Sequence, residues 1–241
     1  MSLLELKAVG KRFGGLKALD DVGFAIEAGE MVGLMGANGA GKTTLFSLIA
    51  GNERPSAGEI RFDGRSLAGC RADQVAARGI ARTFQIVRPF RGLTVRENAR
   101  IGALFGAADR RPAAAEDFAQ AILADVGLAD RADSLAGSLT LAGQKRLEIA
   151  RALAQRPRLL LLDEVMAGLT PPEIADAMAM IRRIKEKHGL TVLVIEHVMS
   201  ALMELCQRIV VLHHGMKIAE DRPHEIARDP RVLDAYLGVE A

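Results

Sequence analysis

The chain has 241 residues, 49% of them hydrophobic and 26% charged, which is typical of one α/β domain or a core with a small inserted subdomain. A formal net charge of +2 gives no electrostatic case for binding nucleic acid, and two cysteines predict neither a disulfide framework nor a zinc site. The first residues lack a basic leader, and no window approaches the roughly 20 apolar residues that cross a bilayer. We therefore expect a protein that reaches a membrane only through a partner.

Strand patterns open the chain. Residues 3–9 and 21–26 read as short strands separated by Gly14 and Gly15, as in an antiparallel layer. Residues 30–35 then form a short apolar run of the buried-strand type, the kind found in a parallel sheet. The chain therefore begins with strands typical of an antiparallel layer, followed by one typical of a parallel sheet.

A glycine-rich loop follows this run and precedes a helix pattern at residues 44–50. Its glycines allow backbone amides to point into one concavity, and the helix N-terminus adds a partial positive charge. Lys42 supplies a mobile cation for the outer phosphates, and Thr43 offers a hydroxyl for Mg²⁺. We predict that this loop binds a nucleoside triphosphate. The predicted ligand-binding residues are Gly36, Asn38, Gly39, Ala40, Gly41, Lys42, Thr43 and Thr44.

From about residue 88 the sequence pattern changes to that of alanine-rich helices. Thr94 and Glu97 form a capping box, and further helices are expected at 113–126 and 143–153. The last helix is expected to bury Leu147, Ala150, Leu153 and Ala154 and to expose Lys145, Arg146, Glu148 and Arg151. We interpret 88–155 as an inserted helical subdomain of one domain. The remaining segments, 1–87 and 156–241, would form the nucleotide-binding core with its β layer.

Two carboxylates end the next buried strand. The apolar run at 158–162 leads directly into Asp163 and Glu164. Parallel sheets place their ligands at the carboxyl ends of their strands. Asp163 can hold Mg²⁺ through its water shell, and Glu164 can polarise an attacking water. Without the phosphate loop, the same pair would read equally well as charges capping a strand at the surface.

Two more polar residues follow predicted strands. His197 comes shortly after the apolar run 190–195, and Gln85 follows the strand pattern 80–84. A lone histidine in such a place is more often structural than catalytic, and a single glutamine is a weak signal. From the residues alone, both readings stay open.

Taken together, these motifs resemble the ATP-binding cassette family over essentially the whole chain, in the family's order: the phosphate loop, Gln85, residues 159–164 and His197. The resemblance implies an α/β fold, with a P-loop NTPase (RecA-like) core and parallel sheet, an N-terminal antiparallel β layer and an inserted α-helical subdomain. It implies an ATPase with ATP and Mg²⁺ as cofactors. The implied catalytic residues are Glu164, His197 and Lys42. The implied magnesium ligands are Thr43, Gln85 and Asp163, and Phe13 would stack on adenine.

The family's signature, Leu-Ser-Gly-Gly-Gln, is altered here to Leu-Thr-Leu-Ala-Gly at residues 139–143. Thr140 keeps a hydroxyl, but Ala142 replaces a glycine that lets the backbone approach the γ-phosphate. A methyl group is tolerable there only if φ is negative or the loop shifts. The resemblance implies a head-to-tail dimer in which Thr140, Ala142 and Gly143 of one subunit complete the ATP site of the other.

Within the family, a subgroup resemblance is to the ATP subunits of branched-chain amino-acid importers. It is carried by residues 79–85, 87–91, 93–98, 146–151 and 167–169 and by the short tail. This subgroup implies a peripheral subunit at the cytoplasmic face of the inner membrane, paired as a homodimer or with a related ATPase. It implies permease subunits as partners and, indirectly, a periplasmic or extracellular substrate-binding protein. We expect the permease surface at residues 86–93, with Arg88, Phe90 and Arg91, because Pro89 and Phe90 place apolar groups among the arginines. The alternative is that these arginines form an ordinary solvated face.

Other readings remain. Lipopolysaccharide-export ATPases share several of these motifs. A soluble cassette ATPase acting on nucleic acid or ribosomes predicts a basic surface, a long coiled-coil insertion or two cassettes, and none is evident. A small-molecule kinase would leave Gln85, residues 140–144 and His197 without a role.

Overall fold

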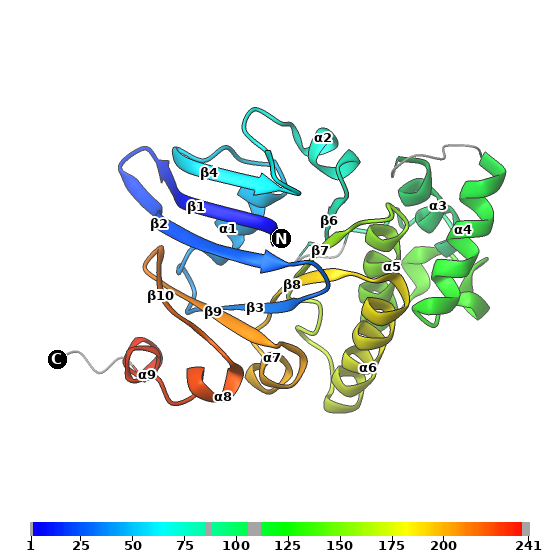
Figure 1. Cartoon of the computed structure of the whole chain (residues 1–241). Helices are drawn as coiled ribbons and strands as arrows, with labels where there is room; N and C mark the ends of the chain where they lie inside the picture. Colours follow the sequence, from blue (N-terminus) through cyan, green and yellow to red (C-terminus); the bar gives the residue numbers. More distant parts are fainter. Residues whose placement is uncertain (1, 85–87, 106–111, 238–241) are drawn as a thin grey trace. The chain divides into compact units, whose positions relative to one another are not determined.

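The computed structural model describes residues 2–84, 88–105 and 112–237 (Figure 1). The chain divides into two compact units, Met1–Val75 with Thr191–Ala241 and Ala76–Leu190. The division expected from the sequence, 88–155 against the remainder, stays a prediction. The predicted fold class is confirmed by the elements described below and by the structural relatives.

An antiparallel sheet occupies the N-terminal part of the first unit (Figure 1). Strand β1 (Ser2–Phe13) pairs with β2 (Leu16–Glu27) on one side and with β4 (Ala57–Phe62) on the other. Strand β5 (Arg65–Ser66) pairs antiparallel with the end of β4. Both β1 and β2 extend beyond the predicted strands. Register shifts along the β1–β2 pair allow this, because bulges let the pairing continue past residues that interrupt the alternation.

A parallel arrangement surrounds strand β3 (Met31–Met35), which lies between β8 (Thr191–Ile195) and β9 (Arg208–His213). All residues of β3 and β8 are buried, as their continuous apolar sequences predict. Strand β10 (Met216–Asp221) returns antiparallel to β9 and forms a hairpin with it. The helices of this unit include α1 (Lys42–Ile49), α7 (Met199–Leu205), α8 (Pro223–Ile226) and α9 (Pro230–Leu237).

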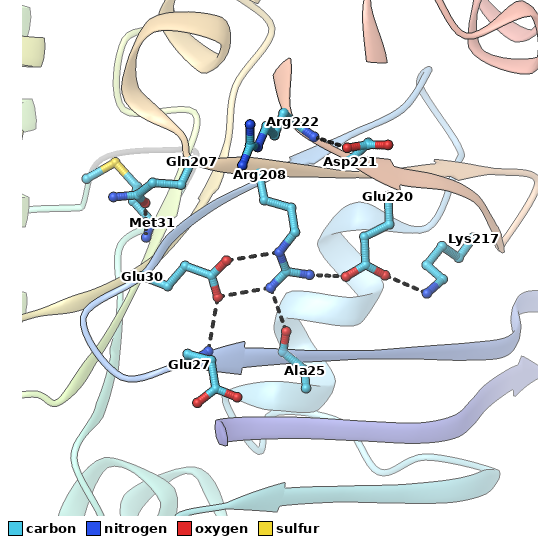
Figure 2. Close-up of polar contacts among 10 residues, drawn as sticks. All are labelled: Ala25, Glu27, Glu30, Met31, Gln207, Arg208, Lys217, Glu220, Asp221 and Arg222. Atoms are coloured by element: carbon cyan, nitrogen blue, oxygen red, sulfur yellow. Dashed lines mark hydrogen bonds and ion pairs between the residues drawn. The ribbon is translucent and has the colours of Figure 1, made fainter. Parts of the chain in front are cut away.

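An ion-pair cluster ties the start of β9 to the end of β2 and the turn after it (Figure 2). The Arg208 guanidinium donates to both carboxylate oxygens of Glu30 at 2.9 Å and to the Ala25 carbonyl at 2.7 Å, and it also pairs with Glu220. Burial alone would raise the pKa of Glu30, but the hydrogen bonds from Arg208 and the Glu27 backbone lower it overall. The cluster therefore joins three segments that are distant in sequence.

The second unit pairs β6 (Ile80–Arg82) in parallel with β7 (Leu159–Asp163). Its long helices are α3 (Val95–Phe105), α4 (Pro112–Asp125), α5 (Leu141–Leu153) and α6 (Pro171–His188). Helix α2 (Ala72–Ala77) precedes β6, and two 3₁₀ turns, Ala129–Arg131 and Ala136–Ser138, precede α5. The capping box of Thr94 with Glu97 is confirmed. Within residues 2–84, 88–105 and 112–237, no helix has the length and apolar character needed to cross a membrane.

Three local predictions in this unit need correction. Helix α5 begins at Leu141 rather than at Gly143, because the Thr140 hydroxyl caps it by accepting from the Gly143 amide at 3.2 Å. Strand β6 ends at Arg82 rather than at residue 84. The predicted exposure of Lys145 and Glu148 is wrong, since only 5% and 6% of their surfaces are accessible. Both side chains have partners inside the unit, described below.

Candidate functional site

The predicted phosphate loop connects β3 to α1 in the first unit. The backbone φ angles of Gly36 and Gly41 are +153° and +101°, in the region that disfavours side chains. A Cβ on Gly36 would lie 2.4 Å from the Leu212 carbonyl oxygen, and one on Gly41 would lie 2.8 Å from the Ala18 carbonyl oxygen. Neither position can accept a side chain without moving the backbone, which explains why the loop needs glycine there.

Lys42 is held inside this loop. Its side chain is largely buried, and its Nζ donates to the carbonyls of Gly36 at 2.6 Å and Ala37 at 3.0 Å. Gly41, at the N-cap of α1, has no side chain to cap the first amides of the helix. These amides and the ammonium group together form the arrangement that binds phosphate in other proteins. Asn38, Gly39 and Thr43 are exposed along the same loop, Thr44 is half-buried and Ala40 is buried.

A tyrosine that the sequence did not single out also reaches this loop. Tyr236, the chain's one tyrosine, is carried by α9 and lies close enough to Gly36 for the backbone of that glycine to affect its pKa. Burial raises the pKa of Tyr236, and the Gly36 backbone opposes the rise. The C-terminal helix therefore contacts the first residue of the phosphate loop, which no local sequence pattern could indicate.

The remaining predicted residues of the first unit lie near strand ends. Phe13 ends β1, is 44% exposed, and has the Lys11 Nζ 4.7 Å from its ring centroid. An exposed aromatic ring of this kind suits stacking on a base. His197 is exposed two residues after the end of β8, and the preceding Glu196 is buried.

The second unit holds the two carboxylates together at the end of β7. Asp163 is 1% exposed, and its Oδ2 accepts from Nη2 of Arg82 at 2.7 Å. Its backbone amide donates to the Thr83 hydroxyl at 3.0 Å. Burial raises the pKa of Asp163, and the Arg82 guanidinium opposes that rise. Oδ1 is buried and finds no hydrogen-bond partner in the described part of the chain, so this oxygen fits a hydrated Mg²⁺ ion.

Glu164 has an unusual backbone. Its φ is +51°, a left-handed conformation that is uncommon for residues other than glycine. Its carbonyl accepts from the Lys145 Nζ at 2.8 Å and from the Ala167 amide at 3.3 Å, and the residue is only 7% exposed. Strained residues held by surrounding contacts cluster at functional sites. Glu164 therefore has the rigid, buried position that an activating carboxylate needs.

The altered signature segment forms the start of α5. Thr140 is exposed at the N-cap, and Ala142 lies in the first turn of the helix. The φ angle of Ala142 is not positive. Its methyl group is therefore tolerated at this position without a shift of the loop. Gly143 follows it within the helix. The expected contact of these residues with a second subunit stays a prediction.

Gln85 and residues 86–87 of the expected permease surface lie outside the described residues. Of that surface, the structure describes Arg88, Phe90 and Arg91. Phe90 is 47% exposed, and the Arg151 guanidinium lies 4.9 Å from its ring centroid.

Sequence reasoning missed three buried charges in the second unit, Arg82, Lys145 and Glu148. Arg82 carried a detectable signal, because a charged residue within an apolar strand needs a buried partner. The sequence held no signal for the burial of Lys145 and Glu148, because the residues around them on α5 are equally compatible with an exposed helix face.

Comparison with known proteins assigns the family. A family model described as ABC transporter matches residues 19–167, and one described as branched-chain amino acid ATP-binding cassette transporter matches residues 216–241. The high-affinity branched-chain amino acid transport ATP-binding protein BraF of Pseudomonas aeruginosa is 39% identical over 98% of both chains. The corresponding protein LivG of Escherichia coli is 37% identical over 98% of both.

A more distant relative is the lipopolysaccharide export system ATP-binding protein LptB of Haemophilus influenzae, 33% identical over 99% of this chain and 98% of its own. A crystal structure of the ADP conformation of an ATP-binding cassette superposes with a TM-score of 0.89 at 30% identity and covers 99% of both chains. The chain therefore belongs to the ABC transporter family, as a subunit that binds and hydrolyses ATP.

Proposed function

We propose that this ATPase powers import of branched-chain or related amino acids, as a peripheral subunit at the cytoplasmic face of the inner membrane. The match of residues 216–241 to the branched-chain model carries this proposal, because that segment lies outside the general ABC transporter match. The names of BraF and LivG support it. ATP binding would close a dimer of two cassettes, identical or related, and closure would be passed to permease subunits that receive cargo from a binding protein.

The residue roles follow from their chemistry. Glu164 orients or deprotonates the attacking water, and Lys42 and His197 stabilise charge on the γ-phosphate. Bound Mg²⁺ would neutralise phosphate charge during the transfer. Its proposed ligands are Thr43, Gln85 and Asp163. The exposure of Asn38, Gly39 and Thr43 on the loop supports these roles. So does the Asp163 Oδ1, which has no hydrogen-bond partner among the described residues.

The remaining roles concern recognition. Phe13 is proposed to stack on adenine, in keeping with its exposed ring. Thr140, Ala142 and Gly143 are proposed to contact the ATP of the second subunit, and Thr140 is exposed for such a contact. The permease is proposed to dock on Arg88, Phe90 and Arg91. A half-exposed aromatic ring among arginines has the composition of an interface centre.

The proposal is tested with the chain co-purified with its permease subunits, reconstituted in liposomes and supplied with the binding protein. Leucine, isoleucine or valine should raise the ATPase rate and be taken up. Lys42→Ala should abolish both, because the loop loses its cation for the outer phosphates. Stimulation by lipopolysaccharide instead of amino acids would favour an LptB-like exporter and refute import.

A further inference from the structure

Three charged side chains stand at three-residue intervals on α5: Lys145, Glu148 and Arg151. Residues with this spacing lie along one side of a helix. Each makes a polar contact with a different segment of the second unit. Together they connect the end of β7, the end of β6 and the start of the proposed permease surface.

The first contact reaches the proposed catalytic carboxylate. The Lys145 Nζ donates to the carbonyl of Glu164 at 2.8 Å, and the lysine is 5% exposed. This bond fixes the backbone of a residue that already has a left-handed conformation. A shift of α5 would therefore move the Lys145 ammonium group that holds the backbone of Glu164.

The second contact reaches the residue just before Gln85. The Glu148 Oε1 accepts from the backbone amide of Phe84 at 2.8 Å. This bond holds the chain just after β6 against helix α5. Burial raises the pKa of Glu148, opposed by the Phe84 amide and the charges of Lys145 and Arg151.

The third contact reaches the proposed permease surface. Nη1 of Arg151 donates to the carbonyl of Arg88 at 2.9 Å, and the guanidinium stacks on the ring of Phe90. Lys145 contacts the residue that carries the proposed catalytic carboxylate, and Arg151, about two turns further along α5, contacts the docking segment.

The presence of Glu148, the middle one of the three charged residues, is not explained by stability alone. Glu148 is buried with one hydrogen bond to the Phe84 amide, and its Oε2 has no hydrogen-bond partner among the described residues. A buried carboxylate with an unsatisfied oxygen costs free energy, and an apolar residue of similar size is often the more stable choice. The carboxylate offers what an apolar residue lacks, a directional link to the chain before Gln85.

We propose that Glu148 is a positioning residue that, with Lys145 and Arg151, couples the docking segment at 88–91 to Glu164. The proposal rests on the proposed function, because that function makes 88–91 the permease surface. Nucleotide binding shifts α5 against β7, and the three contacts carry the shift to the docking segment. Movement of the permease is transmitted along the same contacts in reverse.

The test is hydrogen–deuterium exchange on the full chain, with and without magnesium and a non-hydrolysable ATP analogue. In the wild type, the analogue should change exchange at residues 88–93 as well as at the phosphate loop, 36–43. Glu148→Leu should abolish the change at 88–93 and keep protection at the phosphate loop. Glu148→Gln should restore it, because the amide oxygen still accepts from Phe84. A purely structural role would alter exchange at 88–93 equally with and without nucleotide.

A second pair of variants covers the case in which Glu148→Leu fails to fold. Arg151→Met should also abolish the response at 88–93. Arg146→Met is the matched control on the same helix, since Arg146 contacts Val126 and Asp176 instead, and it should respond as the wild type does. In the permease complex, Glu148→Leu and Arg151→Met should lower the stimulated-to-basal ATPase ratio at least about fivefold.

The outcomes separate this inference from the proposed function. The exchange measurement needs neither permease nor amino acid, so failure of import leaves it informative. A wild-type chain protected at 36–43 but unresponsive at 88–93 would overturn the coupling. Equal behaviour of Glu148→Leu and Glu148→Gln, or of Arg151→Met and Arg146→Met, would overturn it as well.

Discussion

Glu164 combines a carboxylate suited to activating water with a backbone conformation that side chains disfavour. Its φ of +51° is maintained by a buried lysine that binds its carbonyl. Such strain costs about 1–3 kcal/mol and persists only where the surroundings enforce it. At the residue scale, this buried and fixed position supports the proposed role of Glu164 in activating water.

Glu164→Gln should retain ATP binding and lose most hydrolysis. The amide keeps the shape of the side chain but cannot take a proton, so the rate should fall by about 10²–10⁴-fold. ATP should then hold two subunits together, which size-exclusion chromatography with ATP would detect. Glu186→Gln, on an exposed part of α6, is the control and should match the wild type. Near-normal steady-state hydrolysis by Glu164→Gln would reject its assigned role.

At the scale of elements, one arginine links three strands of the first unit. Arg208 joins the start of β9 to Glu30, to the Ala25 carbonyl of β2 and to Glu220 of β10 (Figure 2). Its side chain is 22% exposed and that of Glu30 is 18% exposed, so the pair is only partly screened by solvent. Removing the guanidinium would leave two carboxylates close together without their shared partner.

Arg208→Met should lower the free energy of unfolding by about 2–3 kcal/mol, since charged hydrogen bonds are lost and partly buried acids remain. The pKa of Glu30 is lowered in the folded state, so its pairing stabilises the fold above its ordinary value of 4.5. That contribution is lost as the pH falls through the folded-state pKa. Urea unfolding at neutral and acidic pH should therefore show the difference between wild type and variant shrinking below about pH 4.5.

The control for this prediction is Arg71→Met. Arg71 pairs with Asp73 on the surface, where both side chains are well exposed, and its loss should leave stability unchanged. A difference between wild type and Arg208→Met that stays constant down to acidic pH would contradict the assigned role of Glu30.

At the scale of the whole molecule, the proposed mechanism requires two copies, or a copy and a related subunit. Each phosphate loop would receive Thr140 and Gly143 from the opposite cassette. The exposed N-cap of α5 supports this proposal.

The specific ATPase activity of the isolated chain should rise with protein concentration until the dimer is saturated. The physical reason is mass action, because an incomplete site lacks donors for the γ-phosphate. The measurement is the initial rate over a wide dilution series, repeated with Thr140→Ala, which should lower the plateau. A rate strictly linear in concentration and indifferent to Thr140 would rule out the two-copy site.

The sequence by itself determined the elements whose cause is local. The apolar run at β3 and the capping box at Thr94 each depend on residues within a few positions, and both predictions are confirmed. The glycines of the phosphate loop have the positive φ angles that favour glycine, while their contact with a nucleotide stays a prediction. Gln85 lies outside the described residues, so its role stays a prediction. The family, too, was readable from motif order alone.

The tertiary structure alone decided which charges are buried. Lys145 and Glu148 were expected on the exposed side of α5, yet both are buried. Helical periodicity defines the faces of a helix, but it does not say how many of them are covered. Their partners, Glu164 and Phe84, lie 19 and 64 positions away, so only the folded chain brings the opposing groups together. A buried charge is stable only with such partners, and those partners come from distant parts of the chain.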